Sequence, residues 1–219
     1  MVSIFSDQRV NQGGVRPPWF TLVLGCVLLG LFAVAGPMPD GLVFDRGAIA
    51  AGEWWRLVTG HLVHADGRHL GANVFALMII GTVLESVLRL GSKSLMILNL
   101  FAMLAIDAVL SLAVPGLAWY CGFSGVLNAL FVAAVYGQWR ETAEPVYGLF
   151  ALGGLAKIAI ETSTVGALLP TSSLPSITEA HFAGYSAGLI VCVVAAFLFT
   201  RRGVRRRSRS ALQPIAVES

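Results

Sequence analysis

The sequence predicts an all-α integral membrane protein, built as a bundle of six transmembrane helices. Of its 219 residues, 56% are hydrophobic and only 12% are charged, whereas soluble domains carry about 25% charged residues. The mean hydropathy is +0.77. Apolar runs of spanning or near-spanning length cover residues 19–36, 69–88, 94–114, 122–137, 146–163 and 181–200.

The first apolar run has two interpretations. It follows Arg9 and Arg16 and ends in AVAG (33–36), which resembles a signal-peptide cleavage site. We favour an uncleaved helix, because the run is long enough to cross a bilayer and the chain behind it is also apolar. The expected organisation is a cytoplasmic N-terminus (1–18), one membrane domain (19–200) and a basic cytoplasmic tail (201–219).

The positive charges predict how the bundle is oriented. With six crossings, most of the fifteen Lys and Arg residues fall on one side: Arg9, Arg16, Arg89, Lys93, Arg140 and the six arginines after residue 200. Only Arg46, Arg56 and Arg68 fall on the other. Positive residues favour the cytoplasmic side, so both termini are predicted to be cytoplasmic. The cluster at 201–209 fits an anchor on anionic lipid better than a nucleic-acid patch, and we expect no nucleic-acid partner.

The first external loop, residues 37–68, contains GEWWRLVTGHLVH. Trp54 and Trp55 beside charged residues predict a segment lying in the membrane interface; an ordinary loop with aromatic anchors is the alternative. The three cysteines show no CxxC spacing, so neither a disulfide framework nor a metal site is expected.

Four polar residues are predicted to share one depth. The second, fourth and sixth runs cross in the same direction, which places His69, Asn73, Ser124 and His181 near their external ends. The fourth run is shorter than the roughly 30 Å hydrocarbon layer. Ser124 is therefore expected below the external surface, with Trp119 and Tyr120 as an interfacial rim above it.

These residue types suit hydrolysis of a peptide bond, which needs a nucleophile, a base and donors to an oxyanion. Ser124 is the candidate nucleophile and His181 the candidate base. His69 and Asn73 lie on one helical face and are candidate oxyanion donors. Four glycines allow the fourth and sixth helices to approach closely: Gly122, Gly125, Gly184 and Gly188. Glu179 is expected in a loop, so we predict a Ser-His dyad without an acid.

Each of these signals has a simpler interpretation. Serine in a membrane helix usually bonds to its own carbonyls, and GFSG lacks the strand and spacing of a nucleophile elbow. Lys157 and Glu161 suit either a structural pair or a substrate contact. Asn99 and Asp107 suit interhelical hydrogen bonding. Two histidines, an asparagine and a serine at one depth nevertheless favour a site.

Together these motifs resemble the rhomboid intramembrane serine proteases, over nearly the whole chain. The loop and second helix match W-R-x(2)-T and H-x(4)-H-x(3)-N, and continue to Gly81 and Glu85; GFSG matches GxSG, and AHFAGYSAG matches the final A-H-x-x-G-x-x-x-G. The resemblance implies a rhomboid-like six-helix fold, cleavage of membrane-anchored proteins, and no cofactor. It implies Ser124 as nucleophile, His181 as base, His69 and Asn73 in the oxyanion site, His64 as a supporting histidine, and Glu85 as a structural residue.

One position departs from the common bacterial pattern. Many bacterial rhomboids carry a tyrosine four residues after the serine, stacked on the catalytic histidine, where this chain has Asn128. The short chain, GFSGVLNAL and AKIAIE (156–161) look more like the rhombosortase branch, which is associated with C-terminal Gly-Gly sorting tails of exported proteins. That resemblance implies a bacterial inner-membrane location with the site opening to the external side. The competing classes are a general rhomboid protease, a non-catalytic rhomboid-like binder and a small transporter; the transporter would need inverted repeats that the sequence lacks.

Overall fold

The protein is described here by a computed structural model that covers residues 16–163 and 177–211. The predicted cytoplasmic N-terminus up to residue 15 and the last residues of the basic tail lie outside the described residues. The described chain forms eight α-helices, one π-helical turn and one two-stranded ladder. The elements in order are α1 (Trp19–Ala35), β1 (Phe44–Asp45), α2 (Arg46–Ala50), α3 (Arg56–Leu62), α4 (Gly67–Thr82), η1 (Val83–Val87), α5 (Ser92–Ala113), β2 (Trp119–Tyr120), α6 (Ser124–Thr142), α7 (Val146–Ser163) and α8 (Thr178–Ala211).

The six predicted apolar runs each correspond to a long helix, but the number of membrane crossings stays a prediction. Three helices of the described chain are long and apolar enough to cross a bilayer: Gly67–Val87, Ser92–Ala113 and Thr178–Leu198. Trp19–Ala35 is apolar but shorter. Helices α6 and α7 are not among the helices that are long and apolar enough to cross by this comparison of length and hydropathy.

Two helix boundaries differ from the prediction in ways that affect the site. Helix α6 contains 19 residues and ends at Thr142 rather than Gly137, so its length is about 28 Å. The helix is therefore longer than predicted, because the polar residues after Gly137 continue it, but it still falls slightly short of the roughly 30 Å hydrocarbon layer. Helix α8 likewise continues to Ala211, beyond residue 200.

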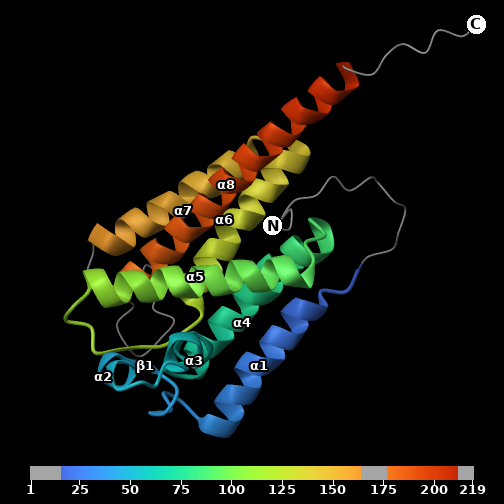
Figure 1. Cartoon of the computed structure of the whole chain (residues 1–219). Coiled ribbons are helices and arrows are strands. Elements are labelled where there is room, and N and C mark those ends of the chain that lie inside the picture. Colours follow the sequence, from blue (N-terminus) through green and yellow to red (C-terminus); the bar gives the residue numbers. More distant parts are fainter. Residues whose placement is uncertain (1–15, 164–176, 212–219) are drawn as a thin grey trace, which may run out of the picture.

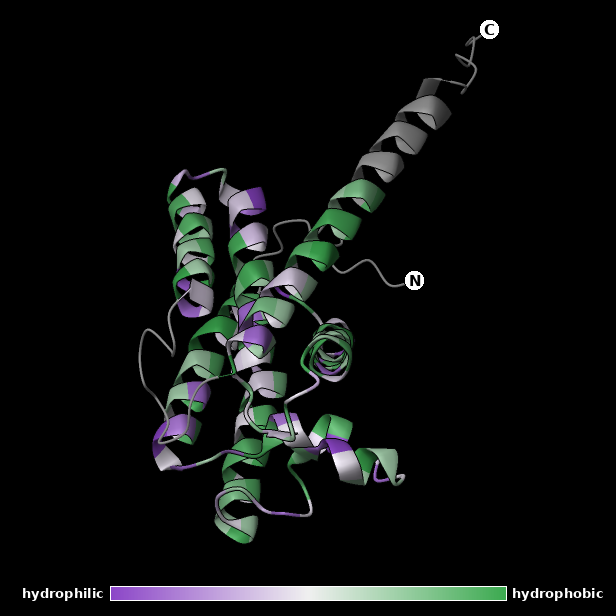
Figure 2. Ribbon diagram, turned by 90° about the vertical axis from the view of Figure 1, so that its left-hand side faces the viewer, coloured by the Kyte–Doolittle hydropathy of each residue, from purple (hydrophilic) through white to green (hydrophobic). Residues whose placement is uncertain are grey.

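Helix α5 runs across the other helices. It lies horizontally in Figure 1 and is seen end-on in Figure 2, while α6, α7 and α8 form one group beside it and α1 and α4 another. The buried core fills the space between these groups, and its largest fully buried side chains are Phe44 and Phe123. Most of the helical surface is apolar, and the hydrophilic residues concentrate toward the loops (Figure 2).

Helix α1 has no side-chain cap of its own and is capped from a distant part of the chain. The Glu85 carboxylate, in η1, accepts hydrogen bonds from the Phe20 and Thr21 amides at 2.9 and 3.0 Å and from the Thr21 hydroxyl at 3.0 Å. A carboxylate at a helix N-terminus satisfies orphan amides and complements the helix dipole. Glu85 therefore links the start of α1 to the segment that follows α4.

The external loop is folded onto the segment that precedes α6. Phe44 pairs with Tyr120 and Asp45 with Trp119 in an antiparallel ladder. The Arg46 guanidinium donates to the Leu110, Ser111, Val114 and Leu117 carbonyls at 2.6–2.9 Å, and so satisfies the last carbonyls of α5. Trp54 and Trp55, beside α3, are 73% and 53% exposed, and their placement in the membrane interface stays a prediction.

Candidate active site

Ser124 is the first residue of α6, and the turn before it is held from two sides. Gly122 has φ +121°, a conformation that favours glycine. Its amide donates to the Gly60 carbonyl of α3 at 3.0 Å. Its carbonyl accepts from the Tyr120 hydroxyl at 2.8 Å. The position of Ser124 is therefore set by the external loop as well as by its own helix.

Tyr120 does not form part of an external rim, and that prediction was wrong. Trp119 is 38% exposed, but Tyr120 is only 3% exposed, because pairing with Phe44 in the ladder turns it inward. Its ring lies 5.4 Å from that of His61, and burial raises the pKa of the phenol. Tyr120 is thus a buried donor beneath the serine turn.

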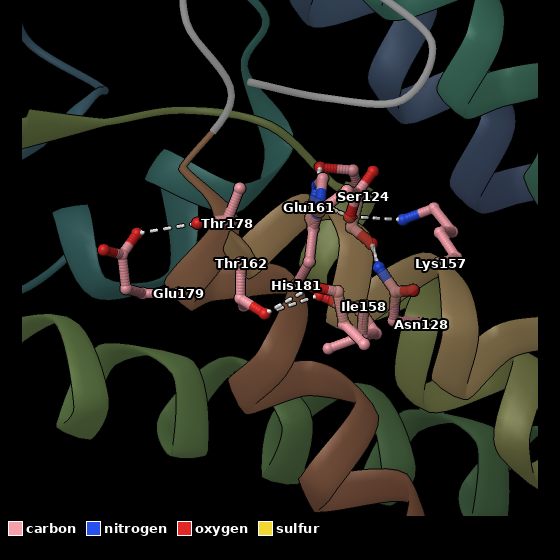
Figure 3. A network of polar contacts seen from close by, with 10 residues as sticks. Ser124, Asn128, Lys157, Ile158, Glu161, Thr162, Thr178, Glu179 and His181 are labelled. Carbon is pink, nitrogen blue, oxygen red and sulfur yellow. Dashed lines mark hydrogen bonds and ion pairs between the residues drawn. The ribbon is translucent and has the colours of Figure 1, made fainter. Parts of the chain in front are cut away.

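His181 lies in the first turn of α8, opposite Ser124. Its Nε2 is 2.8 Å from Ser124 Oγ, and the histidine is 8% exposed. Figure 3 shows the two side chains within one polar network. The nucleophile-to-base distance that general-base catalysis requires is therefore present.

The close approach of α6 and α8 depends on small residues, as their spacing predicts. A Cβ at Gly184 would collide with the backbone carbonyl of Gly125, and one at Gly188 would lie 2.8 Å from the Ala129 carbonyl oxygen. Gly125 faces α8 in the same way, since a Cβ there would lie 2.9 Å from the Ala180 oxygen. The two helices thus touch through backbone atoms.

An acid lies beside His181, contrary to the prediction of a dyad without one. Glu161 Oε2 of α7 is 2.9 Å from His181 Nδ1. The same oxygen accepts from Lys157 Nζ at 2.7 Å. The Glu161 side chain is 3% exposed. Glu179 is exposed and accepts from the Thr178 hydroxyl at 3.4 Å, and it lies apart from this network in Figure 3.

Asn128, the residue that departs from the common pattern, is directed along its own helix. Its Nδ2 donates to the Ser124 carbonyl at 2.8 Å. The amide therefore makes a local helix contact of the kind that short polar side chains favour. The side chain that bonds to Nδ1 of His181 is that of Glu161, not that of Asn128.

His69 and Asn73 lie one helical turn apart in α4. Asp66 caps this helix, and its carboxylate accepts from the His69 amide at 2.9 Å. A Cβ at Gly122 would lie 2.7 Å from His69 Nε2, so the imidazole packs directly on the serine turn. Asn73 is 4% exposed. Its Nδ2 has no hydrogen-bond partner among the described residues.

His64 supports His69 from the external loop. It is fully buried, and the two rings meet edge to face with centroids 5.0 Å apart. Burial, and to a smaller extent the nearby His69, lowers the pKa of His64 to about 3. His64 is therefore a neutral packing partner at physiological pH.

Cys121 is a buried free thiol three residues before Ser124. It is 8% exposed, and burial, followed by the nearby Asp66 carboxylate, raises the pKa of its thiol to about 11. The nucleophilic form of cysteine is the thiolate. Cys121 therefore stays protonated at neutral pH and does not compete with Ser124.

A separate apolar pocket lies further along the same helices. Its volume is about 200 Å³, and its lining comes from α6, α7 and α8. Aromatic residues such as Phe131, Tyr136, Trp139 and Tyr147 dominate that lining, and none of the polar site residues takes part. The candidate chemistry is therefore confined to the end of the bundle where α6 and α8 begin.

Comparison with known proteins identifies the family of this chain. Residues 51–201 match the model of the Rhomboid domain family. The chain is 28% identical over 145 residues to Rhomboid-like protein 11, chloroplastic, from Arabidopsis thaliana. It is 29% identical over 199 residues to Rhomboid-related protein 2 from Mus musculus.

These alignments cover 63% and 80% of this chain, and 51% and 63% of the two relatives. The chain thus spans less than two thirds of the length of either relative. The family model, in contrast, covers most of the chain, including Ser124, His181, His69 and Asn73. On that match and on its apolar helices, the chain is a membrane protein that belongs to the rhomboid family.

Proposed function

We propose that this chain is an intramembrane serine endopeptidase. Ser124 is the nucleophile and His181 the base that takes its proton. The observation that carries the proposal is the 2.8 Å separation of Ser124 Oγ and His181 Nε2, across two helices that touch backbone to backbone. A hydroxyl becomes an effective nucleophile when a base within hydrogen-bond reach accepts its proton.

In the proposed reaction His181 carries one proton in each of two steps, first from the serine and then from water. Ser124 Oγ attacks the scissile carbonyl carbon while its proton passes to His181 Nε2. The tetrahedral intermediate collapses when His181 gives that proton to the leaving nitrogen, and the acyl group stays on Ser124 Oγ. A water molecule then attacks the ester, again with His181 as base. His181 then returns the water's proton to Ser124 Oγ as the bond to the acyl group breaks, which releases the new carboxyl terminus and restores the serine.

His69 and Asn73 are proposed to stabilise the oxyanion. The amide nitrogen of Asn73 is buried with no partner among the described residues, and so is Nδ1 of His69. A buried donor without a partner costs about 1–3 kcal/mol. An oxyanion that accepted from Asn73 Nδ2 would remove that cost in the transition state, where it accelerates the reaction.

The proposed substrates are transmembrane-anchored proteins, which the membrane helices of the enzyme meet within the bilayer. The resemblance of GFSGVLNAL and AKIAIE to the rhombosortase branch favours C-terminal Gly-Gly sorting tails of exported proteins. A general rhomboid protease with other transmembrane substrates is the second candidate. The proposed location is a bacterial inner membrane, with six crossings, both termini cytoplasmic and the site opening to the external side.

Comparative proteomics of C-terminal tails tests the proposal. Cells that express Ser124→Ala or His181→Ala are expected to accumulate uncut membrane-anchored precursors that cells with the unaltered chain process. Ser86→Ala is the matched control, because its hydroxyl bonds to the Arg16 carbonyl beside α1. Equal processing by all four chains would rule out the protease.

The same experiment addresses a non-catalytic rhomboid-like binder. Such a protein would retain its effect on partner abundance when Ser124 is replaced by alanine, since a single hydroxyl contributes little to a protein interface. The protease loses its effect with that substitution. The presence of both Ser124 and His181 at bonding distance favours the protease.

A further inference from the structure

We propose that Glu161 and Lys157 are positioning residues of the same site: Glu161 orients His181, and Lys157 keeps Glu161 ionised inside the membrane. This inference rests on the proposed serine protease function. It extends the Ser-His pair to a chain of four side chains from three helices. In that chain Ser124 comes from α6, His181 from α8, and Glu161 and Lys157 from α7.

The geometry places two donors on one oxygen. His181 Nδ1 lies 2.9 Å and Lys157 Nζ 2.7 Å from Glu161 Oε2. The carboxylate is 3% exposed, while the Lys157 side chain is 42% exposed. Figure 3 shows that Lys157 and Glu161 approach the network from the side of α7. A buried carboxylate is therefore bonded to the base on one side and neutralised on the other.

The contact with Glu161 selects the tautomer of His181. A carboxylate only accepts hydrogen bonds, so Nδ1 must carry the proton. The lone pair then lies on Nε2, which faces Ser124 Oγ and is free to take its proton. The opposite tautomer would present an N–H to the serine and would be unproductive. Glu161 also stabilises the imidazolium that forms during attack.

Lys157 makes this arrangement compatible with a membrane. An isolated carboxylate in an apolar medium tends to become protonated, and a protonated Glu161 would no longer require a proton on Nδ1. The ammonium ion at 2.7 Å favours the ionised form. Lys157 precedes Glu161 by one helical turn, so the pair needs no other element to bring it together.

Other ionisable groups near His181 do not take over this role. His69 of α4 also lies near His181, but it is not an acid. Ser124 and Asn128 are the polar residues of α6 in the network, and Asn128 bonds to the Ser124 carbonyl. Glu179 of α8 is exposed. The second histidine–carboxylate pair, His61 with Asp107 at 3.1 Å, lies between α3 and α5.

Reaction of the purified, full-length protein with a fluorophosphonate probe measures activation of Ser124 without a known substrate. Glu161→Gln is expected to reduce the labelling rate by up to about 10⁴-fold, the loss found when the acid of a Ser-His-Asp triad is replaced by its amide. Glu85→Gln is the matched control, because Glu85 is also buried and hydrogen-bonded but caps α1. Its labelling rate per folded molecule is expected to equal that of the unaltered protein.

The tautomer itself provides a readout that a purely structural role would not change. The chain contains only four histidines, so ¹⁵N spectra of histidine-labelled protein are assignable with His181→Ala as reference. The unaltered protein is expected to show His181 protonated at Nδ1. Glu161→Gln is expected to shift the proton to Nε2, because the amide can donate to Nδ1.

Lys157 is tested by the dependence of labelling on pH. Lys157→Met removes the ammonium ion, so Glu161 becomes harder to ionise and full labelling should require more alkaline conditions. Lys157→Arg keeps the charge and should retain the original profile. Alkaline pH should not restore Glu161→Gln, which has no carboxylate to ionise.

The outcomes separate this inference from the proposed function. If the unaltered protein is labelled and Ser124→Ala is not, the serine is activated. An unchanged labelling rate and an unchanged His181 tautomer in Glu161→Gln would then overturn the role of Glu161 alone. A profile for Lys157→Met identical to that of the unaltered protein would overturn the role of Lys157. Failure of the unaltered protein to label would instead count against the protease.

Discussion

Glu161 differs from the other buried carboxylates of the described chain in the groups that donate hydrogen bonds to it. Glu85 accepts from backbone amides and a hydroxyl at the start of α1, and Asp107 pairs with His61 between α3 and α5. Both join structural elements. Glu161 instead accepts from a histidine whose second nitrogen meets a serine hydroxyl. Its surroundings are therefore those of a residue that acts through a base.

The sequence predicted the residues around Ser124, but for Glu161 it suggested a structural pair with Lys157 or a substrate contact, not a contact with His181. The four-residue spacing of Lys157 and Glu161 is local and visible in the sequence, whereas the contact with His181 joins two helices. A signal was nevertheless present. If α7 crosses in the direction opposite to α6 and α8, Glu161, near its last turn, must lie level with the first turns of those helices.

His64 supports a prediction about stability and pH. Its pKa is about 3 in the folded protein, against an ordinary value of 6.5, so the unfolded chain binds more protons between these values. Stability is therefore fully present above pH 6.5 and decreases as the pH falls toward 3. At pH 5 the loss from this group is roughly 2 kcal/mol.

Thermal unfolding in detergent at pH 7.5 and pH 5 measures this effect. His64→Gln lacks the titrating group, so its midpoint should fall less between the two pH values than that of the unaltered protein. The comparison is made within each variant, which removes any constant cost of the substitution. Equal falls in both proteins would contradict the prediction.

At the scale of elements, the contact between α6 and α8 is the most restrictive in the site. Gly184→Leu is expected to abolish serine labelling, since even a Cβ there would collide with the Gly125 carbonyl. Overpacking of this kind typically costs about 1–3 kcal/mol or more and would move His181 away from Ser124. Gly153→Leu on α7 is the control, because a Cβ at Gly153 meets no atom within 4 Å. Similar labelling of both variants would show that the helix contact does not set the site.

Arg46 links the external loop to the end of α5 and gives a second prediction for an element. Its guanidinium donates to four carbonyls at or just beyond the end of that helix. Arg46→Gln should lower the free energy of unfolding by about 1–3 kcal/mol, which corresponds to a lower thermal midpoint. Arg68→Gln, at an exposed position, should have little effect. An equal shift in the two variants would argue against this role for Arg46.

Apolar length predicted where the long helices lie but not all of their ends. Helix α6 continues through GQWRET because nothing in that stretch stops a helix until Ala143, which adopts a left-handed conformation with φ +56°. The start of α4 at Gly67 had a usable signal in Asp66, a strong N-cap residue. The ladder between Phe44 and Tyr120 joins segments far apart in sequence, and so short a pairing leaves no periodic pattern to read.

At the scale of the whole molecule, the site lies where helices of two groups meet. His69 and Asn73 come from α4, while the other polar residues come from α6, α7 and α8, and α5 crosses between these groups (Figure 1). The sequence predicted a helical membrane domain and which residues share one end of it. It could not predict the crossing of α5, because that direction depends on packing between distant segments.

The orientation of the chain is a prediction for the whole molecule. With six crossings, fluorescent-protein fusions at either terminus should fold and fluoresce on the cytoplasmic side, and an alkaline phosphatase fusion within residues 37–43 should be active on the external side. Fusions that report opposite sides for the two termini would require an odd number of crossings. They would also remove the argument from charge that places the site externally.

The backbone contact between α6 and α8 has a practical consequence for work outside the native bilayer. Because main-chain atoms touch at Gly125 and Gly184, the distance from serine to histidine does not depend on side chains that repack when the surrounding amphiphile changes. One detergent should be as suitable as another while the two helices stay together. Loss of probe reactivity in a given detergent would then indicate that this detergent separates α6 from α8. The reactivity of Ser124 can therefore be used to choose purification conditions.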